Sequence, residues 1–93
     1  MSLAFGLVYH PDVYKDIARL DERFKKRIRV AIESRLALAP HQYGEPLRKT
    51  LKGYWKLRVG DYRVVFKVSG NEVWILGIIH RKEVYEKIGK RFG

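Results

Sequence analysis

Two short stretches of this sequence carry side chains that could bind a phosphate and move protons. The first, KLRVGDYRVVFKV at residues 56–68, places four cations and no acid on one expected strand face: Lys56, Arg58, Arg63 and Lys67. The second, HRKEVY at residues 80–85, holds His80, Arg81 and Tyr85. Cations can stabilise the charge that develops when phosphorus is attacked. Histidine exchanges protons near neutral pH, and tyrosine can do so when nearby cations lower its pKa.

The charge of the whole chain favours a polyanionic partner. Its 93 residues include 20 Lys and Arg against 10 Asp and Glu, which gives a formal net charge of +10. The excess is larger in residues 41–93, with twelve bases and five acids, than in residues 1–40, with eight and five. Such a surface attracts nucleic acid first, and then anionic membranes or an acidic protein.

Several function classes lack their residues in this chain. There is no cysteine for a disulfide or a thiolate ligand, and the three histidines, His10, His41 and His80, have no metal-ligand spacing. Most acids are expected in solvated ion pairs on helix surfaces, as with Glu83 and Lys87. No apolar run approaches the ~20 residues that cross a bilayer, and the start lacks a secretory signal. We therefore expect a cytoplasmic protein without metal, cofactor or membrane partner.

The hydrophobic pattern predicts a single α+β domain over residues 1–93. His10-Pro11-Asp12 and Asp21 are typical helix starts, and apolar residues recur every three or four positions after each. We expect a short strand and then two helices that form an antiparallel hairpin, over residues 4–9 and 11–39.

Three strands and a last helix are expected in the second half, after a loop or arm at residues 41–50. Turn residues and β-branched or aromatic runs place these elements at residues 54–59, 62–68, 73–79 and about 82–91. The order β-α-α-β-β-β-α predicts a helical hairpin packed on a mostly antiparallel sheet.

A two-residue turn at Gly60-Asp61 determines which side chains of the first hairpin share a face. It pairs Arg58 with Arg63 and Lys56 with Val65, opposite a fully hydrophobic face. Like charges directly opposed on a sheet are destabilising. Either these charges are solvated on an outer face, or the face is a phosphate-binding groove with aromatic residues interleaved for base stacking.

The following hairpin extends this register to the last strand. Tyr62 then meets Ile79 on the hydrophobic face, and Arg63 meets Ile78 on the basic face. The register also places His80 on the basic face. The same face would carry four residues available for stacking or for a partner: Tyr54, Trp74, Leu76 and Ile78.

The motifs LKGYWKLRVGDYRVVFKV (residues 51–68) and HRKEVY (residues 80–85) resemble those of the RelE/ParE superfamily of bacterial and archaeal toxins, the RelE branch more closely. The specific part is L-x-G-x-W-x-L-R-x-G-x-Y-R-V, and the expected element order agrees over essentially the whole chain. The resemblance implies the toxin of a type II toxin–antitoxin system. Such a toxin is a metal-free endoribonuclease that cuts mRNA in the ribosomal A site by attack of the ribose 2′-OH.

The resemblance also assigns roles to residues. Arg63 would contact the scissile phosphate, Lys56 matches a family lysine, and Arg81 fits a phosphate-binding arginine. Tyr85 would stack on the substrate or transfer a proton, and the general base stays open among Lys56, His80 and Tyr85. Contacts to RNA or the ribosome are expected from a further set: Lys52, Tyr54, Arg58 and Lys67.

Partners and alternatives follow from the same resemblance. The expected partners are the ribosome, mRNA and a cognate acidic antitoxin that covers either the helical hairpin or the apolar residues of the basic face. The ParE branch has this fold but inhibits DNA gyrase. An inactive relative, a plain nucleic-acid-binding module and a structural protein also remain open, with Tyr85 packed in the core and His80 a surface residue at a strand end.

Overall fold

The fold is a five-stranded sheet with helices on both faces, seen in a computed structural model that describes residues 4–48 and 53–92. The strand order is β1-β5-β4-β3-β2; β1 runs parallel to β5, and the other neighbours are antiparallel. The elements are β1 (Gly6–Tyr9), α1 (Pro11–Ala18), α2 (Glu22–Ala31), the π-helical turn η1 (Ile32–Leu36), α3 (Pro40–Tyr43), β2 (Glu45–Pro46), β3 (Trp55–Val59), β4 (Tyr62–Ser69), β5 (Glu72–His80) and α4 (Val84–Phe92).

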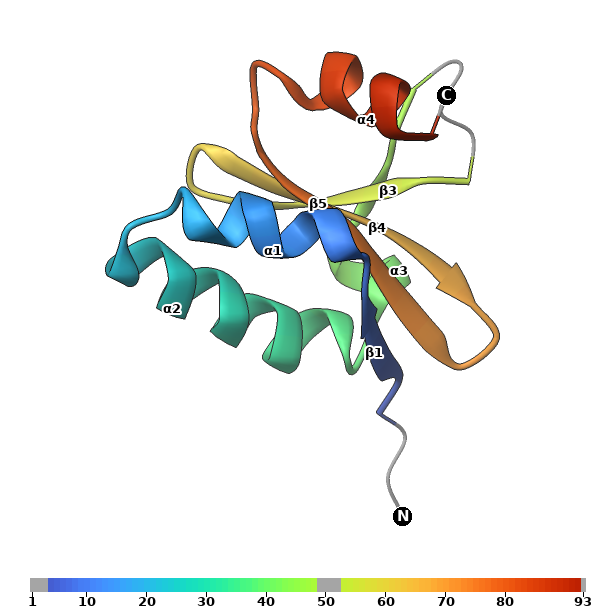
Figure 1. Ribbon diagram of the computed structural model, residues 1–93. Helices are drawn as coiled ribbons and strands as arrows, with labels where there is room; N and C mark the ends of the chain where they lie inside the picture. The colour runs from blue at the N-terminus through green and yellow to red at the C-terminus, as the bar shows by residue number, and fades with distance from the viewer. Residues whose placement is uncertain (1–3, 49–52, 93) are drawn as a thin grey trace.

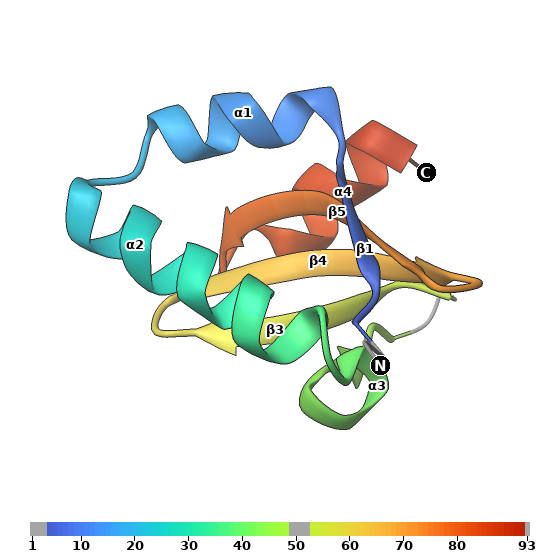
Figure 2. The same cartoon turned by 90° about the horizontal axis from the view of Figure 1, so that it is seen from below.

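The predicted architecture is confirmed, with additions between residues 40 and 46. The hairpin of α1 and α2 covers one face of the sheet, and α4 lies on the other (Figures 1 and 2). The segment expected as a loop or arm contains the short helix α3 and the two-residue strand β2. No helix in the described part of the chain is long and apolar enough to span a bilayer.

Both predicted helix starts are present. The backbone N–H of Asp12 donates to Nδ1 of His10 at 3.1 Å, and Pro11 occupies the first helical position. The N–H of Phe24 donates to Oδ1 of Asp21 at 3.0 Å. These contacts satisfy N–H groups that the first turn of a helix leaves unpaired.

Two hydrophobic clusters lie on the two faces of the sheet. The larger lies under α1 and α2 and includes Val13, Ile32 and Phe66. The smaller lies under α4 and consists of buried residues from four segments: Leu47, Val65, Ile79, Val84 and Ile88. Each face therefore has a helix layer that holds it in place.

The register predicted for the β3–β4 hairpin is confirmed from Trp55, opposite Phe66, to Val59, opposite Tyr62. Arg58 lies opposite Arg63, and Lys56 lies opposite Val65. Gly60 adopts a φ of 60° in the turn, a left-handed conformation that favours glycine.

The register predicted for β4–β5 is correct near the turn and wrong beyond it. Lys67 meets Trp74 as expected, but a bulge follows, so that Arg63 lies opposite Ile79 and Tyr62 opposite His80. The extra residue, in the stretch from Leu76 to Gly77, moves every later side chain to the other face.

The bulge changes what the basic face can present to a partner. Ile78 packs in the cluster under α1 and α2, and Ile79 packs under α4. Leu76 and Ile78, which were expected to be available to a partner, are only 6% and 3% exposed.

A buried ion pair holds this bulge between two helices. The carboxylate of Asp16 in α1 accepts hydrogen bonds from the backbone N–H of Ile78 at 3.0 Å and from Nη1 and Nη2 of Arg91 in α4 at 2.9 and 2.6 Å. Nη1 also donates to the carbonyl of Leu76 at 3.1 Å. A Cβ at Gly77 would lie only 3.2 Å from Nη1, so glycine leaves room for the guanidinium. The hydrogen bonds to Asp16 raise the pKa of Arg91.

Candidate active site

A hollow of about 330 Å³ lies between the sheet and the start of α4. It is lined by Lys56, Arg63, Arg81, Lys82, Val84 and Tyr85. Adjacent strands supply Lys56 and Arg63, the turn after β5 supplies Arg81 and Lys82, and the first turn of α4 supplies Tyr85. Four side chains that the sequence singled out for catalysis therefore meet at one place.

Arg63 is held in place by the turn beside it. Its Nη1 donates to the carbonyl oxygens of Gly60 at 3.1 Å and Tyr62 at 3.0 Å. Burial is the main cause that lowers the pKa of Arg63, and the positive charges of Arg58 and Arg81 lower it further. An arginine remains a cation despite such a shift. An anion bound in the hollow would relieve this repulsion.

Arg81 is linked to the same turn. Its backbone N–H donates to the carbonyl of Asp61 at 2.8 Å, and its Nε lies 3.9 Å from the Asp61 carboxylate. Both side chains are more than half exposed, so this ion pair contributes little to stability. The backbone hydrogen bond joins the turn that precedes β4, which carries Arg63, to the turn after β5, which carries Arg81.

Tyr85 faces outward from α4. Its side chain is 44% exposed, whereas its neighbours Val84 and Ile88 are buried. The Tyr85 hydroxyl accepts a hydrogen bond from the backbone N–H of Arg48 at 3.3 Å. The alternative in which Tyr85 packs in the core with Val84 and Ile88 is therefore wrong, and its ring is accessible from the hollow.

The position predicted for His80 is wrong. The bulge turns His80 to the face of Tyr62, whose ring it meets edge-on at a centroid distance of 5.7 Å. Its Nδ1 accepts a hydrogen bond from the N–H of Lys82 at 3.3 Å. His80 does not line the hollow, so Lys56 and Tyr85 are the two of the three predicted candidates for the base that do.

Acids lie near the hollow but not in it. Glu45 of β2 pairs opposite Lys56, and Asp61 lies beside Arg81. Both act to raise the pKa of Arg63 and so offset part of the repulsion by the other arginines. Among the described residues, no carboxylate lines the hollow itself.

Comparison with known proteins decides the family. The family described as the ParE toxin of the type II toxin–antitoxin system parDE matches residues 7–85. The chain belongs to the RelE/ParE toxin superfamily. This toxin is 34% identical over 73 residues to the Toxin RelE of Mycobacterium tuberculosis, a match that covers 76% of this chain and 75% of that protein. It is 30% identical over 81 residues to the Toxin RelE3 of Methanocaldococcus jannaschii, covering 77% of this chain and 85% of the relative.

A solved structure has the same fold. The RelBE2 toxin–antitoxin complex of Mycobacterium tuberculosis contains a chain that superposes with a TM-score of 0.79 at 24% identity, covering 87% of this toxin and 95% of that chain. At this identity the likeness shows the fold. It agrees with the sheet and helical hairpin described above.

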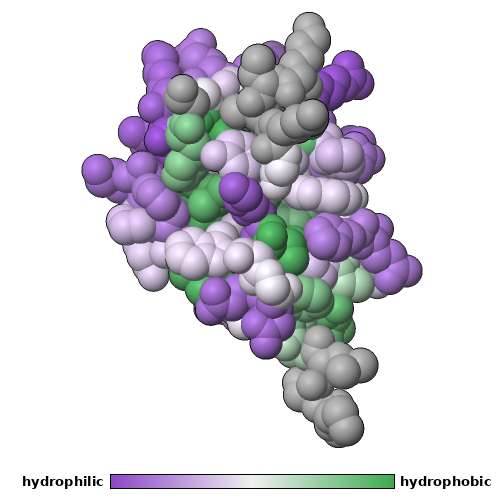
Figure 3. All heavy atoms as spheres, turned by 90° about the vertical axis from the view of Figure 1, so that its right-hand side faces the viewer, coloured by the Kyte–Doolittle hydropathy of each residue, from purple (hydrophilic) through white to green (hydrophobic). Residues whose placement is uncertain are grey.

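The residues expected to contact RNA do not share one location in the toxin. Lys67 lies on β4, four residues beyond Arg63, and its Nζ is 5.2 Å from the ring centre of Tyr54. Neither Lys67 nor Tyr54 lines the hollow. Arg58 lines a different groove, beside α2. Lys52 lies outside the described residues. Figure 3 views the end of the molecule where β4 turns into β5, and hydrophilic and hydrophobic side chains are mixed there.

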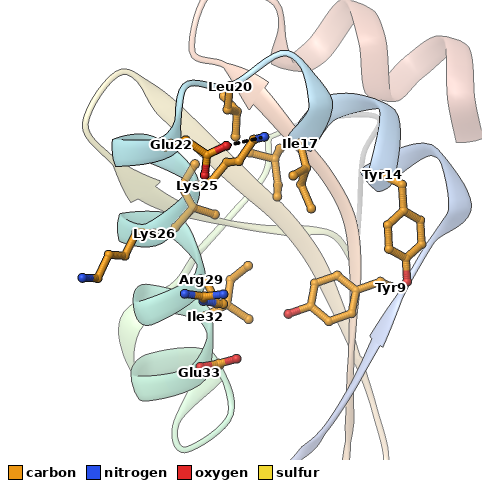
Figure 4. A pocket seen from close by; sticks show the side chains of 12 residues that line it. Tyr9, Tyr14, Ile17, Leu20, Glu22, Lys25, Lys26, Arg29, Ile32 and Glu33 are labelled. Atoms are coloured by element: carbon orange, nitrogen blue, oxygen red, sulfur yellow. Dashed lines mark hydrogen bonds and ion pairs between the residues drawn. The ribbon is translucent and has the colours of Figure 1, made fainter.

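A second, more apolar groove of about 570 Å³ lies in the helical hairpin of the toxin (Figure 4). Its floor contains Ile17, Leu20, Ile28 and Ile32, and Tyr9 reaches into it from β1. Burial and the charge of Glu33 raise the pKa of Tyr9, so this hydroxyl is a poor proton donor to water. Exposed apolar surface of this kind marks sites that bind a protein or another ligand.

Proposed function

We propose that this toxin is an endoribonuclease that cleaves mRNA, with the ribosomal A site as the place of cleavage. The observation that carries the proposal is the convergence of Lys56, Arg63, Arg81 and Tyr85 on one hollow that no described carboxylate lines. Cations fixed in place before the substrate binds are the groups that a phosphoryl reaction requires. The two relatives named RelE toxins favour this activity over gyrase inhibition, which remains the alternative because the matching family is described by ParE.

The proposed reaction uses only the side chains of the hollow. The ribose 2′-OH loses a proton to a base and forms a bond to phosphorus, and the bond from phosphorus to the 5′ oxygen breaks as that oxygen gains a proton. The products are a 2′,3′-cyclic phosphate and a 5′-OH. Arg63 and Arg81 stabilise the negative charge on the pentavalent phosphorus, and Lys56 and Tyr85 are the candidates for base and acid.

In the proposed reaction the two arginines of the hollow supply the charge stabilisation. In residues 4–48 and 53–92 there is no group of three or more His, Asp or Glu side chains that could hold a metal ion. Two arginines with planar, multiply donating guanidinium groups can contact the non-bridging phosphate oxygens in its place.

An assay on ribosomes programmed with a short mRNA tests this function and the reassigned histidine together. We expect the wild-type toxin to leave 2′,3′-cyclic phosphate and 5′-OH ends. His80→Ala should keep its rate within a few-fold because His80 lies outside the hollow, whereas Lys56→Ala should lose about 10²-fold or more. Thermal melting of both variants would show whether each is folded. An intact rate in Lys56→Ala, or a loss in folded His80→Ala as large as expected for Lys56→Ala, would contradict this site.

We also propose that an acidic antitoxin binds the helical hairpin. Of the three apolar residues expected on the basic face, Leu76 and Ile78 are buried and Trp74 is 40% exposed. The apolar groove between α1 and α2 is therefore the more extensive of the two surfaces. Three cations and two acids also line the groove, namely Lys25, Lys26, Arg29, Glu22 and Glu33, and Lys25 pairs with Glu22 at 3.2 Å. The remaining positive charge and the apolar floor suit an acidic amphipathic chain. The RelBE2 and M. jannaschii RelB–RelE structures are themselves toxin–antitoxin complexes.

A pair of tyrosine variants tests this partner surface. Tyr14 is 63% exposed and lines the groove, whereas Tyr43, 50% exposed, lies on α3 outside it. We expect Tyr14→Glu to weaken binding of the protein encoded beside this toxin by at least tenfold, by placing a negative charge against an acidic chain, and Tyr43→Glu to change it little. Isothermal titration measures both. The proposal that the antitoxin binds the helical hairpin would be refuted if the wild-type toxin formed no complex with that protein. It would also be refuted if the two variants bound that protein with equal affinity.

A further inference from the structure

A strongly basic groove, separate from the candidate active site, runs between α2 and the edge of the sheet. It has a volume of about 570 Å³. Five cations line it: Arg23, Lys26, Arg27, Arg35 and Arg58. Among the residues that the structure describes, no carboxylate lines this groove, and none lies within 4.0 Å of any of these five charges.

The two walls of the groove come from different elements. On α2, Arg23 and Arg27 are four residues apart and therefore lie one above the other, about 5–6 Å between Cβ atoms. The guanidinium of Arg27 lies 5.3 Å from the ring centre of Phe24, which restrains it. Arg58 on β3 supplies the opposite wall. It lies past Trp55 and Lys56, the two residues of β3 that pair with β2.

The groove and the candidate active site are adjacent across one pair of arginines. Arg58 pairs directly with Arg63, and Arg63 lines the catalytic hollow. The turn between β3 and β4 lies between α2 on one side and the start of α4 on the other (Figures 1 and 2). The groove and the hollow are therefore joined through the Arg58–Arg63 pair, while the exposed carboxylate of Asp61 lies in the turn itself.

We propose that this groove binds the phosphate backbone of structured RNA at a distance from the cleaved bond. Like charges gathered without acids repel one another, and a polyanion with closely repeated charges would neutralise several at once. Arginine contacts phosphate through two donors in a fixed geometry. An acidic protein is less favoured as the partner of this groove. The apolar residues that line it are Val30, Ala31 and Val59, whereas isoleucine and leucine side chains line the groove of the helical hairpin. The choice of RNA as the polyanion rests on the proposed function.

The salt dependence of RNA binding tests the proposal. The variant R23Q/R27Q removes two charges from the groove and keeps good helix formers. The control K15Q/K90Q removes two charges from α1 and α4, at residues that line neither the groove nor the catalytic hollow. Fluorescence anisotropy with a labelled RNA hairpin would give the affinity of each protein at several salt concentrations, and circular dichroism would confirm that both are folded.

We expect the groove variant to reduce the slope of log affinity against log salt by about 1.5, as lost contacts to two phosphates require. The control should lower the slope by less than half as much. Equal slopes for the two variants would overturn the proposal. So would unchanged RNA binding by R23Q/R27Q together with weaker binding of polyglutamate, which would make the groove a protein-docking surface.

The hairpin assay also separates this inference from the cleavage reaction. Reduced hairpin binding by R23Q/R27Q supports the groove whether or not the toxin cuts mRNA. Cleavage that depends on Arg63, with identical hairpin binding in both double variants, would leave the nuclease proposal standing and reject the groove.

Discussion

Arg63→Ala is expected to reduce the rate of mRNA cleavage by about 10²–10³, the usual effect of removing one preorganised charge stabiliser from an active site. The guanidinium is held by two turn carbonyls and faces the hollow beside Arg81, while the core lies elsewhere. Stability should change by less than about 1 kcal/mol, and the repulsion from Arg58 would even be relieved. Single-turnover cleavage on programmed ribosomes measures the rate, and thermal melting measures the fold.

Lys90→Ala is the matched control for this loss of charge. Lys90 is an exposed residue on α4 whose only near carboxylate in the described chain is that of Glu86, at 3.8 Å. The Lys90→Ala toxin should cleave mRNA at nearly the wild-type rate. A folded Arg63→Ala that cleaves as fast as Lys90→Ala would show that the hollow does not stabilise the reacting phosphate.

Asp16→Ala is expected to lower the free energy of unfolding by about 3–5 kcal/mol, the cost of removing one partner of a buried ion pair. The change leaves the guanidinium of Arg91, only 17% exposed, without its carboxylate, and it leaves the N–H of Ile78 unpaired at the bulge. The effect is large for a chain of 93 residues, whose total stability is of order 5–15 kcal/mol. Urea unfolding followed by circular dichroism measures it.

Asp12→Ala provides the comparison on the same helix. Asp12 also lies near Arg91, with its carboxylate 3.8 Å from Nε, but its side chain is 38% exposed. We expect a cost below about 1 kcal/mol. Equal costs for the two variants would mean that the Asp16–Arg91 pair does not hold α1, the bulge and α4 together.

The first hairpin could be predicted from sequence because its signals agree with one another. The turn at Gly60-Asp61 sets the register, and polar and apolar side chains alternate on both sides of it, which fixes the face of each residue. The sequence therefore predicts the positions of Lys56 and Arg63 correctly.

The bulge could not be predicted from the pattern of β5. The run from Trp74 to Ile79 is almost wholly apolar because helices cover both faces of the sheet there, so no alternation marks the register. The sequence therefore assigned His80, Ile78 and Ile79 to the wrong faces. The one local sign is Gly77, since an isolated glycine in a strand can indicate a bulge.

Asp16 and the groove beside α2 were missed for different reasons. Asp16 has the same spacing on its helix as a solvated acid, and its partner Arg91 lies 75 residues away in the sequence. The cations of α2 were visible in the sequence, but only the packing of α2 near the edge of β3 brings them opposite Arg58.

The most direct measurement of the central claim is a map of new 5′ ends on cellular mRNA. Wild type and the double variant R63A/Y85F would be expressed from a tightly controlled promoter. We expect growth arrest with cuts in phase with codons for the wild type, and neither for the folded double variant. Growth arrest with DNA damage and no new 5′ ends would contradict the nuclease account and support gyrase inhibition.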